Sequence, residues 1–411
     1  MFIQNIRFIL LGLLIIILFL MFNYWRVDQD INLKDLNDKE KDNIYKSSDI
    51  KDLEHFSYKN DVIKSSIDEN LNENSFFSNI VYIKTDIYNI KIDLYGGDII
   101  FLELLKYPIS KCKNSSGYVL FDTSNVKNYF AQSGLLSETL SDSNFGSVKF
   151  FCEKNNFEMY NLDTLEVNLI YETENNIKFI KKYTFKKNNY LIDVEYIVTN
   201  KSDKFYYGYM YGRLKQTERV NNDNILMMSA RSYVGGAIYT PEKHYKKISF
   251  SDIESDKLFE RQILGGWIAM VEHYFISAWI PSSVTEHCYC SEKYGEKTYG
   301  LIFIDKKPLI VEPGATNSIK CNLFVGPEIV DVLKNITNGL SLTVDYGILW
   351  PIAQPIFWLL KKAYNFSHNW GFAIILTTLF IKLLFYKLAA SSYKSMGKMR
   401  QLQPRINLLK E

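Results

Sequence analysis

The sequence predicts a membrane protein in which two apolar spans flank one large antiparallel β-sandwich. The first observation is an unbroken apolar run from Phe8 to Phe22, near the amino terminus. The second is a long middle region, from Phe76 to about Val332, where short alternating strands are separated by turn residues. The third is another apolar run, from Trp370 to Tyr386, which follows a segment suited to the membrane surface.

Composition limits the function before any motif is considered. The 411 residues suffice for one large domain or two ordinary ones, each with a real core. Lys plus Arg number 48 against 46 Asp plus Glu, and a net charge of +2 gives no support to broad electrostatic binding of nucleic acid. The aromatic content of 15% suits strands and membrane interfaces, and nine Pro with 20 Gly exclude collagen-like architecture.

The first apolar run predicts an uncleaved anchor. From Phe8 to Trp25 it has 18 residues, which cover about 27 Å as a helix, close to a bilayer core of about 30 Å. A cleaved signal peptide is the alternative, but it needs small residues after the run. Residues 21–25 are bulky and aromatic instead, so the anchor is favoured. Residues 26–75 are rich in Lys, Asp, Glu and Asn, and predict a polar, solvated linker.

Alternation of apolar and polar residues predicts strands in the middle of the chain. It is clearest over residues 165–171 and 192–198. Asn175-Asn176 and Asn188-Asn189 supply turns, because asparagine tolerates left-handed backbone angles. The glycine pairs fit bulges or tight turns, and none belongs to a nucleotide-binding motif; they are Gly96-Gly97, Gly235-Gly236 and Gly265-Gly266.

The five cysteines are too few and too scattered for a disulfide scaffold. Cys288 and Cys290 would share one face of a strand, and His287 beside them suggests zinc. No second pair at ligand spacing completes four ligands, so ordinary strand residues are the preferred interpretation. No metal site and no cofactor is predicted. The cysteines are Cys112, Cys152, Cys288, Cys290 and Cys321.

The apolar, aromatic stretch from Leu349 to Lys362 contains Pro351 and Pro355, which interrupt a spanning helix. A helix on the membrane surface suits its aromatic content and basic end, and a core helix packed on the sandwich is the alternative. The second span follows, and residues 389–411 carry many cations against one acidic residue, Glu411. That basic flank indicates the cytoplasmic side, so the large domain is expected outside and both termini inside.

Lys382 is the most unusual residue of the second span. It lies 12 residues, about 18 Å, beyond Trp370, and a lysine at a membrane centre costs about 2.5–3.5 kcal/mol. Snorkelling toward the head groups is one explanation, and a wet cavity is the other. Thr378, Lys382 and Tyr386 are spaced four apart, so they form one polar stripe on a helix. The residues alone do not separate these explanations.

Longer motifs resemble the YidC/Oxa family of membrane protein insertases, most closely its Gram-negative bacterial form. The resemblance in the carboxy-terminal part runs through Asp345-Tyr346-Gly347, Gln354-Pro355, Asn369-Trp370-Gly371-Phe372, Tyr393, Ser395-Met396, Lys398-Met399-Arg400 and Leu402-Gln403-Pro404. In the middle region it includes Tyr239-Thr240-Pro241, Gly265-Gly266-Trp267-Ile268-Ala269-Met270, His273-Tyr274-Phe275, Ala278-Trp279-Ile280-Pro281 and Val325-Gly326-Pro327-Glu328.

The resemblance implies an insertase and chaperone of the bacterial inner membrane, not an enzyme. Its expected partners are nascent inner-membrane proteins, the Sec translocon with its subunits, the lipid bilayer and, as a further candidate, the ribosome. The family holds a basic residue, usually arginine, in a hydrophilic groove, and Lys382 stands at that position, with Thr378 and Tyr386 wetting the same face. The middle region would be a periplasmic domain with a sugar-binding type of β-sandwich fold.

The resulting domain organisation is a prediction. It comprises a cytoplasmic amino terminus (1–7), a transmembrane helix (8–25), a polar periplasmic linker (26–75), a periplasmic β-sandwich (76–335), an interfacial amphipathic helical segment (336–368), a second transmembrane helix beginning an α-helical insertase core (369–388) and the start of a cytoplasmic basic helical region (389–411).

The sequence departs from the family pattern in three ways. Lys382 replaces the usual arginine, and Lys387 stands where proline is common. The chain ends at Glu411, before the later transmembrane helices, so it is expected to lack a complete insertion site. A membrane-anchored periplasmic binding module, incompetent for insertion, is therefore the alternative function. A hydrolase or epimerase is disfavoured, because none of the five histidines forms a catalytic motif with a neighbouring carboxylate.

Overall fold

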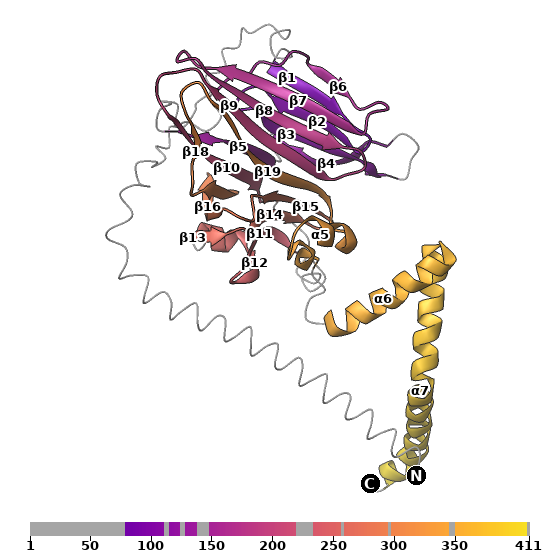
Figure 1. Ribbon diagram of the computed structural model, residues 1–411. Helices are drawn as coiled ribbons and strands as arrows, with labels where there is room; N and C mark the ends of the chain where they lie inside the picture. The colour runs from indigo at the N-terminus through magenta and orange to yellow at the C-terminus, as the bar shows by residue number, and fades with distance from the viewer. Residues whose placement is uncertain are drawn as a thin grey trace, which may run out of the picture. The chain divides into compact units, whose positions relative to one another are not determined.

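The computed structural model describes residues 79–110, 115–123, 128–137, 148–218, 233–255, 259–294, 297–344 and 350–408. The predicted anchor (8–25) and polar linker (26–75) lie outside these residues. The chain forms two compact units, of which one, Leu53–Val344, contains every described strand. The other contains the described helices α6 (Trp350–Ser367) and α7 (Trp370–Leu408) (Figure 1).

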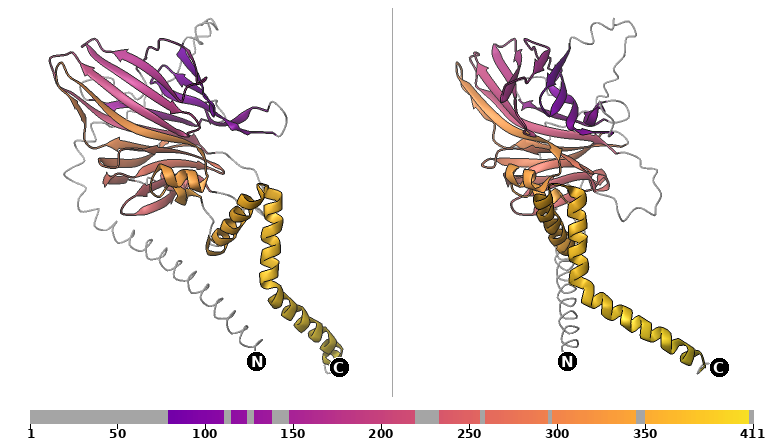
Figure 2. Two further views of the ribbon diagram at one scale, coloured as in Figure 1. Left: turned by 45° about the vertical axis from the view of Figure 1, so that its right-hand side comes forward. Right: turned by 90° about the vertical axis from the view of Figure 1, so that its right-hand side faces the viewer.

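The strand unit is a sandwich of two sheets (Figures 1 and 2). The 8-stranded sheet has the order β12 (His244–Ile248), β11 (Val234–Thr240), β14 (Trp267–Glu272), β15 (Phe275–Ile280), β19 (Thr316–Pro327), β9 (Leu191–Asn200), β8 (Ile177–Lys186), β7 (Thr164–Glu172). The 11-stranded sheet has the order β13 (Phe259–Leu264), β16 (Glu286–Tyr294), β17 (Thr298–Asp305), β10 (Tyr206–Thr217), β5 (Phe130–Leu136), β3 (Asp98–Pro108), β2 (Tyr88–Asp93), β1 (Ile80–Lys84), β6 (Asn156–Glu158), with β18 (Leu309–Val311) on β10 and β4 (Gly117–Asp122) on β3.

Pairing is antiparallel throughout the described sheets except between β1 and β6, which run parallel from Tyr82 opposite Asn156. The predicted antiparallel β-sandwich is therefore confirmed. Its core lies between the two sheets, where Trp267 and Trp279 are fully buried or nearly so. Burying such large aromatic surfaces supplies the main stabilisation of a layered domain, because each removes a large apolar area from water.

The β7–β8–β9 meander shows how local sequence determines this fold. Buried side chains alternate with exposed ones along β7 and with partly buried ones along β8 and β9, as the apolar pattern predicts. The backbone turns at Asn176, with φ 58°, and at Asn188, with φ 55°. Both predicted asparagine turns are therefore confirmed. Gly96 and Gly97, with φ 75° and 64°, likewise form the predicted tight turn, here between β2 and β3.

The end of the sandwich unit is formed by α5 (Val330–Ile336) and the 3-10 helix η3 (Leu340–Thr343). Both pack onto the sheets, and Leu333 and Leu340 are completely buried. The indole of Trp267 donates to the carbonyl of Asn338 at 3.0 Å. The compact unit thus extends to Val344. A further short helix, α4 (Phe250–Glu254), begins at a capping box formed by Ser249 and Asp252.

The helix α6 is continuous through Pro355. Pro351 lies in the first turn, where amide groups have no helical acceptor, whereas Pro355 lies in the second turn, where its missing N–H removes one helical hydrogen bond, to the carbonyl of Pro351. Several of its large side chains are exposed: Ile352, Ile356, Phe357, Trp358 and Phe366. The stretch that was expected to form a helix on the membrane surface thus lies in an 18-residue helix that contains both prolines.

Candidate functional site: the α6–α7 hairpin

A tight turn joins α6 to α7. His368 adopts a left-handed conformation, with φ 50°, and its amide donates to the carbonyl of Tyr364 at 2.7 Å. Asn369 then caps α7, because its side-chain oxygen accepts from the amide of Phe372 at 3.2 Å. Ser367 donates to the carbonyl of Ala363 at 2.9 Å. These local hydrogen bonds satisfy backbone carbonyl groups at the end of α6 and a backbone amide at the start of α7, which otherwise lack helical partners. They also hold the two helices as a hairpin.

Side chains on both helices fix how the hairpin packs. The rings of Tyr364 and Trp370 stack, with centroids 4.0 Å apart and planes 14° apart. About one turn further along α7 Ala373 is completely buried, and about two turns further along Thr377 is 5% exposed. Residues four apart lie on one helix face, so α6 covers the face of α7 that carries Ala373 and Thr377.

The helix α7 is long and apolar enough to cross a membrane, and it is the one helix of that kind in the described part of the chain. The qualifying stretch, Trp370–Met399, has 30 residues, or about 45 Å at the helical rise. Only 11% of its most apolar window is buried within the protein, unlike the core helix of a soluble domain. Lipid is the medium that suits such an apolar surface.

The three predicted groove residues lie together on α7. Thr378, Lys382 and Tyr386 occur at successive four-residue intervals of one continuous helix, and all three are exposed. The Thr378 hydroxyl donates to the carbonyl of Ile375 at 2.9 Å. Lys382 follows Ala373 by nine residues, which is about half a turn more than two full turns. The polar stripe therefore lies on the side of α7 opposite the face that α6 covers.

The charge of Lys382 has no counter-ion in the hairpin. From Trp350 to Leu408 the sequence contains no Asp or Glu, so neither helix can offer a carboxylate. An ammonium group in apolar surroundings is costly without a partner or water. The stripe thus combines two hydroxyl groups with an exposed cation on an otherwise apolar helix, an arrangement that can attract polar or acidic groups of another molecule.

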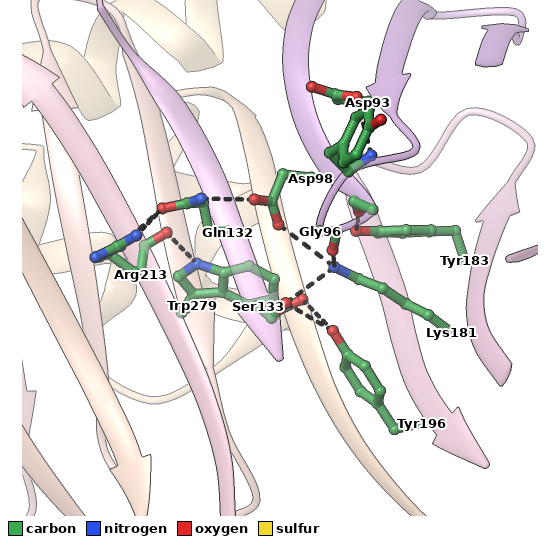
Figure 3. A network of polar contacts seen from close by, with 12 residues as sticks. Asp93, Gly96, Asp98, Gln132, Ser133, Lys181, Tyr183, Tyr196, Arg213 and Trp279 are labelled. Atoms are coloured by element: carbon green, nitrogen blue, oxygen red, sulfur yellow. Dashed lines mark hydrogen bonds and ion pairs between the residues drawn. The ribbon is translucent and has the colours of Figure 1, made fainter. Parts of the chain in front are cut away.

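The sandwich holds a second polar cluster, in its interior (Figure 3). Lys181 on β8 is completely buried, and its ammonium donates to the carbonyls of Gly96 at 3.1 Å and Ser133 at 3.0 Å. Its third neighbour is Asp98 Oδ1, at 3.5 Å. The other oxygen of Asp98 accepts from Gln132 at 2.6 Å. Burial lowers the pKa of Lys181 to about 8, and the Asp98 carboxylate opposes that shift.

Most polar groups of this interior network find hydrogen-bond partners within the protein, whereas Asp98 Oδ1 has only its ion pair with Lys181. The Gln132 carbonyl accepts from Arg213 Nε at 2.8 Å, and Arg213 Nη1 donates to Tyr294 at 2.8 Å. The hydroxyl of Tyr196 donates to the Ser133 carbonyl at 2.7 Å. Charged groups enclosed in this way fix the packing of two sheets, and they leave no donor of Lys181 directed at a ligand. Sequence analysis missed the network, although Lys181 stands at an inward position of β8.

The Cys288 and Cys290 side chains share one face of β16, as predicted for ordinary strand residues. His287 is completely buried on the opposite face, where its Nδ1 lies 2.7 Å from Asp305. Its Nε2 lies 2.7 Å from the carbonyl of Ser282. The described residues contain no group of three or more His, Cys, Asp or Glu side chains that could hold a metal ion.

Comparison with known proteins finds two families that match parts of the chain. Residues 80–359 match the family described as YidC periplasmic domain, and residues 362–411 match the 60Kd inner membrane protein family. Membrane protein insertase YidC of Cellvibrio japonicus is 38% identical over 333 residues, covering 81% of this chain and 60% of the relative. The same protein of Ectopseudomonas mendocina is 34% identical over 354 residues, with the same coverage of both chains. The chain thus spans about 60% of the length of these relatives.

Among solved structures, a galactose mutarotase related enzyme of Lactobacillus acidophilus covers 60% of this chain and 97% of its own, with 11% identity and a TM-score of 0.41. A likeness this distant carries no argument about activity. The family matches extend over the sandwich and over α6 and α7, and they agree with the resemblance seen in the sequence motifs. The chain belongs to the YidC family of membrane protein insertases.

Proposed function

We propose that this chain acts as a membrane protein insertase and chaperone, which helps inner-membrane proteins to insert and fold, and not as an enzyme. The observation that carries the proposal is Lys382, an exposed cation without a carboxylate in its hairpin, on the face of an apolar helix that α6 leaves uncovered. The names of the relatives support it. Nascent inner-membrane proteins, the Sec translocon and the ribosome are its proposed partners.

The proposed placement puts the protein in the bacterial inner membrane. Residues 8–25 anchor it, with residues 1–7 in the cytoplasm and the linker and sandwich in the periplasm. The amphipathic helix α6 lies along the periplasmic surface, where the exposed Trp358 and the cations of Lys361 and Lys362 suit head groups. The helix α7 crosses the bilayer, as part of an insertase core, and its basic end enters the cytoplasm.

Lys382 would then work by electrostatic attraction. In surroundings of low dielectric constant its charge interacts strongly with an acidic or polar segment of a client, whereas in water the same attraction is weak. The hydroxyl groups of Thr378 and Tyr386 would hydrogen-bond to that segment and keep the stripe hydrated. Because no carboxylate within the hairpin pairs with the cation, a client can bind transiently and then leave sideways into lipid.

Site-specific photo-crosslinking in membranes tests the proposal. A photoreactive residue at Thr378 or Tyr386 should crosslink to nascent clients during their synthesis. Leu384 is the matched control, because it is exposed on α7 at a similar depth but lies on the other side of the helix from Lys382. Equal crosslinking from Leu384 would mean that clients contact α7 without regard to the polar stripe, and no crosslinking from any position would refute the function.

A further inference from the structure

The second half of α7 has two chemically different faces. Lys387, Lys394 and Lys398 are all exposed, and at about 100° per residue they fall within about 40° of one another around the helix. We call these three residues the lysine stripe. Tyr393, Met396 and Met399 are centred on the opposite side, and they are 75%, 52% and 69% exposed.

The lysine stripe has no carboxylate partner within the α6–α7 hairpin. No Asp or Glu occurs between Trp350 and Lys410, so the cations of both helices must find their counter-ions elsewhere. The first lysine of the stripe along the chain, Lys387, directly follows the apolar stretch that ends at Tyr386. Under the proposed placement this position lies at the cytoplasmic membrane surface, where the phosphates of anionic lipids are concentrated.

The course of α7 keeps the whole stripe near that surface. A straight helix perpendicular to the bilayer would carry Lys398 about 16 Å beyond Lys387, out of reach of the head groups. Figure 2 shows instead that α7 changes direction about halfway along, so that its second half runs obliquely to the first. Ser391-Ser392 lies near the middle of its 39 residues, a composition typical of helix bends.

We propose that the second half of α7 lies in the cytoplasmic interface and docks on anionic phospholipid head groups through the lysine stripe. Tyr393, Met396 and Met399 enter the boundary with the acyl chains, and the lysine side chains extend to the phosphates. An RNA partner would satisfy the cations, but it would leave the apolar face in water. This inference rests on the proposed transmembrane placement of α7.

Hydrogen exchange of the full chain in lipid nanodiscs tests the inference. One set of discs contains phosphatidylcholine alone, and the other contains about one-third phosphatidylglycerol. Amides of residues 388–399 should exchange roughly tenfold more slowly in the anionic discs, and added salt should reduce that protection. Residues 370–386 should be protected in both discs, which reports the transmembrane placement separately.

Two variants with the same change in charge make the test specific. K387Q/K394Q/K398Q removes the lysine stripe while keeping good helix formers, and it should abolish the difference between the discs. K187Q/K306Q/K307Q removes three exposed lysines of the sandwich, and it should leave the difference unchanged. Glutamine keeps the length and polarity of the side chains, so that the comparison isolates their charge.

Other outcomes would overturn the inference. Equal exchange of 388–399 in both discs, whether fast or slow, would mean that anionic lipid is not the partner of the stripe; slow exchange in both would indicate a covering protein surface. Protection that survives K387Q/K394Q/K398Q would exclude the lysines as its cause. Rapid exchange of 370–386 would refute the transmembrane placement itself, and the inference with it.

Discussion

Lys181 Nζ lies 3.5 Å from Asp98 Oδ1 in the interior of the sandwich, and this ion pair joins its two sheets. Lys181 belongs to β8 of the 8-stranded sheet, and Asp98 belongs to β3 of the 11-stranded sheet. The first side chain is completely buried and the second residue is 5% exposed. Removing one member of such a pair leaves the other as an uncompensated charge in a medium that solvates it poorly.

Lys181→Met should therefore destabilise the sandwich by roughly 3–5 kcal/mol, because the Asp98 carboxylate would keep only neutral partners. Urea unfolding followed by tryptophan fluorescence measures this difference. Lys182→Met is the matched control, since Lys182 points outward on the same strand and pairs with Glu195 at 3.2 Å. That partly exposed pair should contribute at most about 1 kcal/mol. Equal losses in the two variants would contradict a stabilising role for the buried pair.

The stability of the sandwich should pass through a maximum at alkaline pH. The pKa of Lys181 is lowered to about 8 by burial, below its ordinary value of 10.5. Between these values the unfolded chain binds more protons than the native one, so stability rises with pH, by up to roughly 3 kcal/mol. Burial raises the pKa values of Tyr88, Tyr183 and Tyr196 above 10. Above pH 10 only the unfolded chain releases these protons, so stability then falls.

Unfolding curves collected from pH 7 to 12 test both halves of this dependence. Lys181→Met should lose the rise between pH 8 and about 10 but keep the fall above it, because its tyrosines are unchanged. A rise of the same size in the variant would assign the effect to another group. A steady decline of the native protein from pH 8 would show that the Lys181 ammonium is not unfavourable in the folded state.

Much of the sandwich could be predicted because its signals are local. The alternation from Leu165 to Tyr171, and the turns at Asn176 and Asn188, depend on residues close together in the chain. Strand neighbours could not be predicted in this way. The strand β10 lies between β5 and β17, and β1 pairs in parallel with the distant β6. These pairings depend on how the faces of entire sheets pack against each other, and a short stretch of sequence does not contain that information.

The interior ion pair shows the same limit at the level of one residue. Alternation along β8 places Lys181 among inward residues, so its burial could have been predicted. Its partner could not, because Asp98 comes from the other sheet. For the hairpin, four-residue spacing was enough to align Thr378, Lys382 and Tyr386. Which face of α7 is covered depends on the turn at His368, which brings α6 against Ala373 and Thr377, and no local sequence signal predicts the left-handed backbone of that histidine.

Gly339→Ala should disturb the packing between the sandwich and its carboxy-terminal segment. Gly339 has φ 77°, and an added Cβ would overlap the ring of Tyr239. That ring stacks on Trp267 at a centroid distance of 5.9 Å. Overpacking of this kind costs about 1–3 kcal/mol, in addition to about 1–2 kcal/mol for a left-handed alanine. The expected result is a lower urea midpoint together with a shift of the Trp267 fluorescence.

Gly314→Ala separates the two contributions to this loss. Gly314 has nearly the same backbone angle, φ 75°, but nothing lies within 4 Å of a Cβ there. Gly314→Ala should therefore be destabilised only by the cost of a left-handed alanine, and the tryptophan emission of this variant should stay unchanged. If both variants were destabilised equally, the contact between Gly339 and Tyr239 would contribute nothing to stability.

Substitutions of Lys382 should affect clients according to charge. Lys382→Glu should reduce insertion of a client with an acidic translocated tail by roughly tenfold, which corresponds to about 1.4 kcal/mol, because attraction becomes repulsion. Lys382→Arg keeps the charge and should preserve most of the activity, whereas Lys382→Ala should lie between these two. The measurement is protease protection of the tail after synthesis into membranes that hold each variant at equal abundance.

A client with a neutral tail provides the decisive comparison, because an electrostatic role predicts that its insertion responds much less to Lys382→Glu. Equal defects for acidic and neutral tails would point to a disturbed helix rather than a lost charge. Leu384→Glu tests that explanation, since it places a new carboxylate at a similar depth on the opposite side of α7. If Leu384→Glu discriminated between the two clients as strongly as Lys382→Glu, the position of Lys382 on the uncovered face of α7 would have no special role in client recognition.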